Sequence, residues 1–337
     1  MSITKLVKDF FSHYLELPQK SPQIVCLGGG TGLSILLSGL KYYSNQITAV
    51  VTMCDEGGSS GRLRRTLGVP PVGDLRDCLA ALSYAPPTMT KLLNYRFAGE
   101  RYGKDTELGG HNFGNLLLVA LSDITGDFNK GLDEASKILN VSGRVLPSTA
   151  EDVHIWAETS DGQKVYGEEK IDLGKYDGKR EIVKLHLDPP DVSGYRPSVQ
   201  TIKNANVITA GPGDLYTSIM PNLLVKEIRL AISSPLAKKI LIINIANKPF
   251  ETPNYKASDY LEAIKKHCGK NLFDYILLNT NHTHTLDSYP GYHYVENDYT
   301  NLKKLKGLKI ITGDFVDRSY PLHHNSDKLA KSIMAII

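Results

Sequence analysis

The chain has 337 residues, of which 41% are hydrophobic and 22% are charged, a composition typical of globular proteins and far from disordered or fibrous chains. The formal net charge is only +3, so the charge balance gives no reason to expect binding to nucleic acid. Cys26, Cys54, Cys78 and Cys268 form no C-x-x-C pair, which predicts free thiols in a reducing cytoplasm.

Residues 1–22 carry apolar side chains at helical spacing between charged ones. They lack the unbroken apolar core of a signal peptide, and no uncharged run in the chain approaches the ~20 residues that span a bilayer. We predict an N-terminal amphipathic helix that packs on the domain or on a partner subunit, with contact to a membrane surface as the alternative. Residues 23–337 form one predicted domain with an inserted β region at 151–190.

The stretch 23–33, QIVCLGGGTGL, is typical of a buried strand that runs into a glycine turn and a helix. Such a turn brings backbone N–H groups close to a phosphate at the N-terminus of the helix, and Thr31 is placed to cap that helix. The dinucleotide pattern G-x-G-x-x-G is matched only in part, because its third glycine is replaced by Leu33. The alternative is a tight turn that binds nothing.

A second strand is predicted at 47–53, after a helix at 34–43. Asp55 follows it, about twenty positions beyond the glycine turn, where a dinucleotide fold holds a ribose hydroxyl. Strands that alternate with helices at this spacing predict a Rossmann-like doubly wound parallel sheet, whose ligands bind at the C-terminal ends of the strands.

Further polar segments accompany this pattern. The stretch 57–65 is predicted to be a second phosphate-binding loop, with Arg62 suited to an oxyanion and a mobile surface loop as the alternative; Asp74 then caps a helix. A glycine-rich loop at 102–115 would direct His111, Asn112 and Asn115 from a helix N-terminus into the cleft, whereas a lone histidine there more often caps or packs.

From residue 151 the pattern changes to alternating strands at 153–159, 164–171 and 181–187, which predicts a small antiparallel sheet. The parallel pattern returns at 206–210 and leads into a third glycine turn at 211–217. Further strands are predicted at 239–246, 274–279 and 310–311, with a last helix at 327–337. His282 and His284 have metal-site spacing, but no cysteine or acid completes the set, so we predict a surface turn.

Three strand-to-loop junctions of this kind lie along one edge of a parallel sheet, and a cleft lined by them suits a nucleotide or a nucleotide sugar. The blocks that carry this chemistry also resemble those of a known family. GGGTGLS, CDEGGSSGRLR, PPVGDLRDCLAAL, GGHNFGNLLLVAL and GPGDLYTSIMPNLL are similar, in the same order, to blocks of the bacterial gluconeogenesis-factor (YvcK-type) proteins. Those proteins belong to the CofD-like group, which includes 2-phospho-L-lactate transferase.

The resemblance implies a Rossmann-like fold, a cytoplasmic location, binding of UDP-sugars such as UDP-N-acetylglucosamine, and a regulatory role in growth on gluconeogenic carbon sources and in cell shape. A homo-oligomer or a regulatory protein partner is compatible with it. The ligand-binding residues that the loops and the resemblance together indicate are Gly29, Gly30, Thr31, Gly32, Asp55, Gly58, Ser59, Ser60, Arg62, His111, Asn112, Asn115, Gly211, Gly213, Asp214, Tyr216 and Thr217.

Two enzymatic alternatives remain at this point. A transferase of the phospholactate type would use Mg²⁺, with Asp55 or Glu56 as metal ligand or base. The family usually has two aspartates there, so Glu56 makes metal-dependent transfer less secure, and we assign no metal ligand. An NAD-dependent dehydrogenase is disfavoured by Leu33 and by the additional GGSSGRLRR segment.

Overall fold

The computed structural model describes residues 21–100, 104, 107–175, 181–233 and 236–337. The predicted N-terminal helix falls on residues 1–20 for nearly all its length and therefore lies outside the described residues. Within the part of the chain that is described, no helix has both the length and the apolar character needed to cross a membrane.

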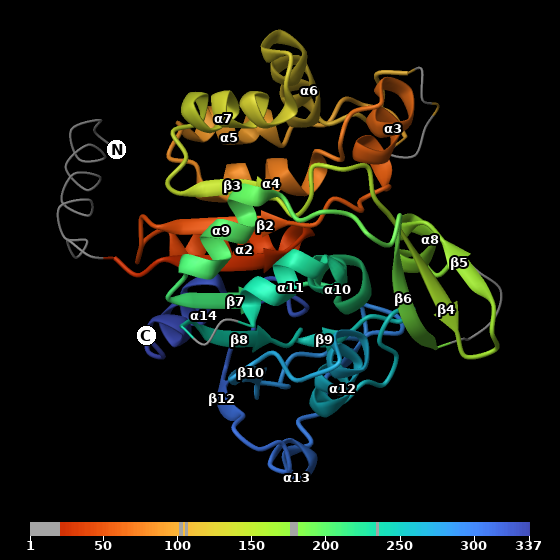
Figure 1. The fold of residues 1–337 in the computed structure, drawn as a ribbon, viewed down its shortest axis with the longest axis vertical. Coiled ribbons are helices and arrows are strands. Elements are labelled where there is room, and N and C mark those ends of the chain that lie inside the picture. The colour runs from red at the N-terminus through yellow and green to blue at the C-terminus, as the bar shows by residue number, and fades with distance from the viewer. Residues whose placement is uncertain (1–20, 101–103, 105–106, 176–180, 234–235) are drawn as a thin grey trace.

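A seven-stranded sheet lies at the centre of the molecule, with the strand order β12-β10-β8-β7-β1-β2-β3 (Figure 1). Every strand pairing in it is parallel. The strands are β1 (Ile24–Gly28), β2 (Ile47–Val51), β3 (Arg144–Pro147), β7 (Val207–Ala210), β8 (Lys238–Ile242), β10 (Tyr275–Asn279) and β12 (Lys309–Gly313). The predicted Rossmann-like parallel sheet is confirmed, although β3 was not predicted, because it is short and ends in a proline.

The order of the strands creates a switch point beside β1. From β1 the chain moves outward through β2 to the edge strand β3, and it then returns to place β7 on the other side of β1. In doubly wound sheets the two connections that leave the C-terminal ends of such neighbouring strands diverge to opposite faces, which opens a crevice.

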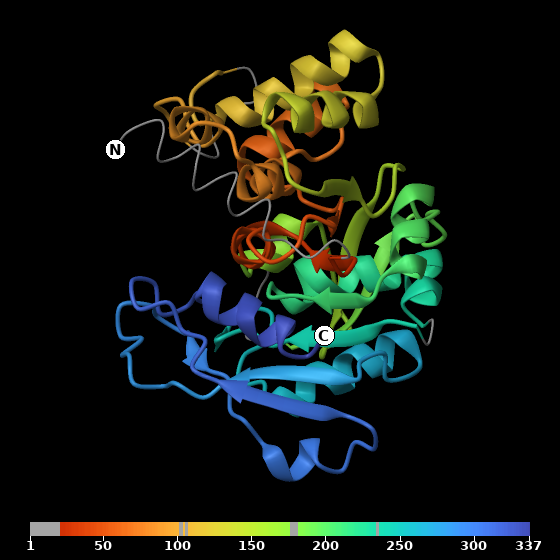
Figure 2. The same cartoon turned by 90° about the vertical axis from the view of Figure 1, so that its left-hand side faces the viewer.

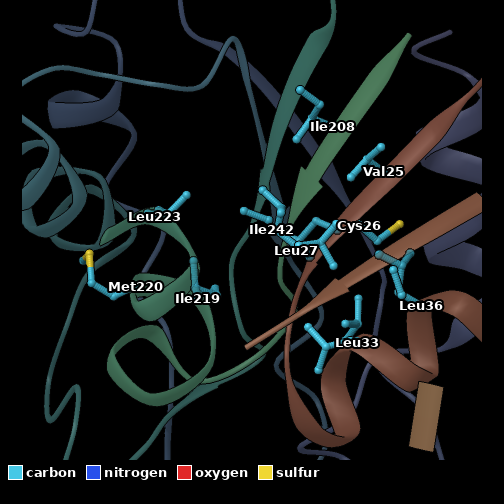
Figure 3. Close-up of a cluster of buried hydrophobic side chains, with 14 of the residues drawn as sticks. Val25, Cys26, Leu27, Leu33, Leu36, Ile208, Ile219, Met220, Leu223 and Ile242 are labelled. Atoms are coloured by element: carbon cyan, nitrogen blue, oxygen red, sulfur yellow. The ribbon is translucent and has the colours of Figure 1, made fainter. Parts of the chain in front are cut away.

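Strand β1 lies at the heart of the sheet, and all five of its residues are buried. Its side chains alternate between the two faces, as Figure 3 shows: Cys26 lies toward Leu33 and Leu36 of helix α2, whereas Ile219 lies on the side of Leu27. Both faces of the sheet are therefore covered by apolar side chains, which is why the strands read as continuous apolar runs.

Helices cover the two faces. On one face α2 (Gly30–Leu40) contacts α4 (Gly73–Leu82) and α14 (Ser326–Met334). On the other face, α9 packs against α11 in front of the sheet in Figure 1, and α10 contacts both α11 and α12. Their bounds are α9 (Arg196–Asn204), α10 (Met220–Leu224), α11 (Lys226–Ile232) and α12 (Ala257–Cys268), with a π-helical turn η1 (Leu215–Ile219) before α10.

A helical layer lies beyond the edge strand β3, at the top of Figures 1 and 2, where α6 packs on α5 and α7. Its helices are α5 (Pro87–Leu93), α6 (Phe113–Thr125) and α7 (Phe128–Ile138). Elsewhere in the described part of the chain lie α3 (Gly58–Leu67), α8 (Glu168–Asp172) and α13 (Tyr299–Leu302). Strands β9 (Ala246–Asn247) and β11 (His293–Tyr294) form a separate antiparallel pair.

The predicted antiparallel insertion is a three-stranded sheet with the order β5-β4-β6, at the right of Figure 1. Its strands are β4 (His154–Thr159), β5 (Lys164–Tyr166) and β6 (Ile182–Asp188). The prediction of a strand over 164–171 is wrong in its second half. Gly167 has a φ of +96°, which turns the chain out of β5 and starts the short helix α8 instead.

Two predicted helix caps and one predicted loop also differ from the structure. Helix α2 begins at Gly30 with Gly29 as its N-cap residue, so Thr31 lies inside the first turn and is not the cap. Asp74 lies in the first turn of α4, after the N-cap residue Val72. The stretch 57–65 was predicted as a loop, but all of it after Gly57 lies in α3, where a Cβ atom on Gly61 would overlap the carbonyl of Glu56.

The four cysteines are free, as predicted. Burial raises the pKa of the Cys26 thiol and of the Cys54 thiol to about 12 in each case. Both thiols therefore stay protonated and unreactive, and they act as small apolar side chains.

Candidate functional site

A cleft of about 420 Å³ lies at the C-terminal ends of β1, β2 and β7, where the strand order changes direction. Residues 29–32 line it after β1, Thr52 and Asp55 after β2, and residues 212–214 after β7. Its volume is within the range of small-molecule sites, and its position is where doubly wound folds bind their ligands.

We call residues 29–32 and 212–213 the glycine wall. A Cβ atom on Gly32 would lie 2.5 Å from the carbonyl oxygen of Pro212, so only glycine lets α2 approach the second turn this closely. Gly30 has a φ of +62° and Gly213 one of +156°, values that favour glycine. The amide of Gly213 is held by Asn244 Oδ1 at 2.9 Å. The two turns that were predicted to face one ligand do lie in contact.

Carboxyl groups line another part of the cleft. We call these residues, Asp55, Asp74, Asp77, Glu168 and Asp172, the acidic wall. Burial raises the pKa of the Asp74 carboxyl well above its ordinary value, and Asp55 and Asp77 raise it further. Burial, then Asp55 and Asp172, raise the pKa of Glu168 in the same way. Such a wall is stabilised by a cation or by hydrogen-bond donors, because both reduce the repulsion between its members.

Lys248 joins this wall to the second glycine turn. Its Nζ contacts Asp172, lies 2.6 Å from Asp214 Oδ2 and lies 3.5 Å from Glu251 Oε1. These three carboxylates could together hold a metal ion, since their ligand atoms lie within 4.8 Å of one another. Burial alone would lower the pKa of Lys248, but the carboxylates raise it above its ordinary value. The ammonium group is therefore the cation at this point.

Glu251 fixes the turn behind the cleft. It is 1% exposed, and its Oε2 accepts hydrogen bonds from the amides of Tyr216 at 2.9 Å and Thr217 at 3.3 Å. Its Oε1 accepts a bond of 2.8 Å from Thr217 Oγ1. Thr217 lines the cleft, whereas Tyr216 is buried and its hydroxyl meets that of Tyr255.

Many of the predicted ligand-binding residues line the cleft, and others do not. Those that line it are Gly29, Gly30, Thr31, Gly32, Asp55, Ser59, Ser60, Asn115, Gly213, Asp214 and Thr217. Those that do not line it are Gly58, His111, Asn112, Gly211 and Tyr216, with Arg62 described below. Asn112 accepts a hydrogen bond from the amide of Asn115 as the N-cap of α6, and His111 is buried beside Ser59.

Arg62, the predicted oxyanion ligand, does not line the cleft. It is 1% exposed, and its guanidinium donates to the carbonyl oxygens of Gly109 at 2.8 Å, Glu107 at 2.5 Å and Lys104. The helical form of α3 turns this side chain away from the cleft, so Arg62 ties α3 to a neighbouring loop. The arginines that line the cleft are Arg76 and Arg96.

Glu56, one of the two candidate catalytic residues, does not line the cleft either. Its carboxylate contacts the Nδ1 atom of His154 on β4, so it links the main sheet to the insertion. Asp55 does line the cleft, and its Oδ1 accepts a 2.9 Å bond from the amide of Gly57.

Sequence reasoning missed several cleft residues, namely Asp74, Asp77, Glu168, Asp172, Asn244, Lys248, His323 and His324. Asn244 follows β8 closely, so the rule that ligands meet strand ends would have found it. Glu168 and Asp172 lie on α8 of the insertion, which no local pattern connects to the main sheet. Burial lowers the pKa of His324 to about 4, so this histidine is neutral at physiological pH.

The fold and the site define a Rossmann-like α/β protein whose cleft lies at the switch point between β1 and β7. The model of the family described as 2-phospho-L-lactate transferase CofD matches residues 24–316. The chain therefore belongs to the CofD family.

Its relatives agree with this assignment. The protein named gluconeogenesis factor in Halalkalibacterium halodurans is 41% identical over 319 residues, which cover 94% of this chain and 96% of the relative. That of Bacillus subtilis is 40% identical over 326 residues, covering 94% and 99%. A crystal structure from Bacillus halodurans, described as a member of the UPF0052 family, superposes with a TM-score of 0.85 at 40% identity and covers 94% of this chain and 100% of that one.

Proposed function

We propose that the cleft binds a nucleotide sugar, a UDP-sugar such as UDP-N-acetylglucosamine, and that the protein acts as a cytoplasmic regulator of carbon metabolism and cell shape without turnover. The names of its relatives favour the gluconeogenesis-factor branch of the family. The observation that carries the ligand assignment is the contact between two glycine turns, each at the end of a central strand, beside a wall of carboxylates.

Each wall suits one part of such a ligand. Backbone N–H groups of the glycine wall, with Arg76 and Arg96 nearby, suit the diphosphate. Asp55 follows β2 and suits a ribose hydroxyl, while the rest of the acidic wall suits the hydroxyl groups of the sugar. The amide of Gly30 donates a hydrogen bond to the Asp74 carboxyl, so this carboxyl is where the acidic wall meets the glycine wall.

The direct test is isothermal titration of the full chain with UDP-N-acetylglucosamine, UDP-glucose, GTP and NAD, with and without Mg²⁺. We expect a UDP-sugar to bind more tightly than NAD by at least about tenfold, or about 1.4 kcal/mol. Equal or tighter binding of NAD, or no binding of any UDP-sugar, would overturn the proposal.

A second function, transfer of phospholactate from a nucleotide-activated donor to a deazaflavin acceptor, is favoured by the description of the family. It requires Mg²⁺, and the acidic wall fits such an ion, because the buried Asp74 and the adjacent Asp55 are hard oxygen donors whose repulsion a cation would offset. Bound there, the ion would neutralise charge on a leaving diphosphate. Release of free nucleotide in the presence of donor and acceptor would distinguish this enzyme from the regulator.

A further inference from the structure

Asn115 occupies the first turn of α6 and lines the cleft, yet only one end of its amide is used. The residue is 2% exposed, and its Nδ2 donates a 3.2 Å hydrogen bond to Ser59 Oγ. Its Oδ1 is buried and has no hydrogen-bond partner among the residues that the structure describes. A buried oxygen without a donor is costly, so this atom indicates a place where a ligand is expected to donate.

The orientation of that amide depends on Ser59. Its Oγ lies 3.2 Å from the backbone N of Asn112, 3.2 Å from Asn115 Nδ2 and 3.0 Å from His111 Nδ1. A serine hydroxyl has one hydrogen to donate and two lone pairs to accept with. The N–H of Asn112 can only donate, and it takes one lone pair. When the second lone pair of Ser59 accepts from Asn115 Nδ2, the hydroxyl hydrogen of Ser59 is directed to His111 Nδ1. That nitrogen must then carry no proton.

A proton on His111 Nδ1 would reverse the amide of Asn115. If His111 carried a proton on Nδ1, Ser59 would accept from it and would donate to the amide oxygen of Asn115. The amide would then be reversed, with its NH₂ group on the cleft side. Whether His111 Nδ1 carries a proton thus decides whether Asn115 offers the cleft an acceptor or a donor, although His111 itself does not line the cleft.

We propose that His111 and Ser59 are positioning residues that direct the carbonyl oxygen of Asn115 toward the cleft, and that the ligand therefore donates a hydrogen bond there from a hydroxyl or an amide N–H. A phosphate oxygen is excluded from this point, because two acceptors would face each other. The identity of the ligand rests on the proposed function, whereas the orientation of the amide does not. The carboxylates of Asp55 and Asp74, which line the same cleft, are also acceptors, so a polyhydroxyl group suits the cleft.

The first experiment needs no ligand. Long-range proton–nitrogen NMR spectra of the full chain with isotope-labelled histidine report the tautomer of each of its 10 histidines. The His111 signal is identified by its absence from His111→Phe. We expect an unprotonated Nδ1 and a protonated Nε2. A protonated Nδ1 in the folded protein would overturn the proposal, whatever the protein binds.

The second experiment measures the dissociation constant of UDP-N-acetylglucosamine for the parent, His111→Phe, Asn115→Ala and the double variant. The phenyl ring introduced by His111→Phe fills a similar volume and removes the acceptor, so the hydroxyl of Ser59 turns to Asn115 and reverses the amide. We expect each single variant to raise the dissociation constant about tenfold. The double variant should have the same dissociation constant as each single variant, because both changes remove the same acceptor.

Losses that multiply in the double variant would mean that His111 only packs, and would overturn the proposal. Circular dichroism and the ligand-free Tm of each variant separate binding from folding. If the parent does not bind the UDP-sugar while the NMR signal shows an unprotonated Nδ1, the proposed function fails and the orientation of Asn115 is upheld.

Discussion

The two walls of the cleft hold a ligand by different means. The glycine wall works through the backbone, and its geometry depends on the absence of side chains at Gly32 and Gly213. The acidic wall works through carboxylates from separate layers of the molecule, since Asp74 lies on α4 and Glu168 on α8 of the insertion. Backbone amides do not titrate near neutral pH, whereas the acidic wall responds to protons and cations. The two walls meet where the amide of Gly30 donates to the Asp74 carboxyl, so variants that affect one wall alone lie away from this contact.

The largest effect is expected from Lys248→Met, which removes the cation held by Asp172, Asp214 and Glu251. Three carboxylates would remain close together and largely shielded from water, and we expect the free energy of unfolding to fall by about 3 kcal/mol. Urea denaturation at pH 7 measures it. Lys328→Met is the matched control, since it removes an exposed ion pair with Asp314 and should cost less than about 1 kcal/mol. Equal losses would show that the Lys248 cluster is no more than a surface ion pair.

The glycine wall is tested by Gly32→Ala. The new Cβ atom would lie 2.5 Å from the backbone oxygen of Pro212, so either α2 or the second turn must move, at an expected cost of about 2 kcal/mol. Gly68→Ala is the control, because Gly68 has a φ of +65° but nothing within 4 Å of its Cβ position, and should cost only about 1 kcal/mol of backbone strain. If Gly32→Ala were as stable as the parent, the close approach of the two turns would be wrong.

The residues changed in these two variants also differ in how well the sequence predicted their contacts. Gly32 belongs to a strand-turn-helix pattern that is contained in the single stretch 23–33, and such local patterns predicted the sheet and the glycine wall. Lys248 and Asp172 are 76 positions apart, and nothing in either segment indicates that they meet. Arg62 was misplaced for a related reason: its residue type suits an oxyanion, but the direction of its side chain depends on α3 being a helix. Local chemistry was predictable, whereas contacts between layers were not.

A third prediction concerns pH. Burial lowers the pKa of His324 to about 4, whereas an unfolded histidine titrates near 6.5. The unfolded chain therefore binds more protons between these values, and the stability that the neutral His324 contributes is present above pH 6.5 and lost as the pH falls toward 4. Between pH 7 and pH 5 we expect a loss of about 2 kcal/mol from this residue.

Urea denaturation at pH 7, 6 and 5 of the parent and of His324→Gln checks this linkage. The difference in unfolding free energy between the two proteins should shrink or reverse on acidification. His293→Gln, which replaces an exposed histidine, should keep the slope of the parent. If His324→Gln kept the slope of the parent, the acid sensitivity would belong to a group other than His324, and this prediction would be wrong.

The smallest effect distinguishes Arg76, which lines the cleft, from Arg62, which the sequence predicted as the anion ligand. Arg76 lines the cleft, with its Nη2 2.5 Å from Asp77 Oδ1. Arg62 instead donates to the carbonyl oxygens of Lys104, Glu107 and Gly109. If the ligand carries a diphosphate, Arg76→Gln removes a charge that faces it and should raise the Kd of UDP-N-acetylglucosamine about tenfold, or about 1.4 kcal/mol. Arg62→Gln should lower the Tm and leave the Kd of the folded protein within about twofold, because its guanidinium holds backbone rather than ligand. Titration calorimetry with the Tm of each variant measures both quantities. The reverse result, a tenfold loss in Arg62→Gln alone, would mean that α3 rearranges on binding and delivers Arg62 to the phosphates, and the glycine wall would then share its role with a side chain.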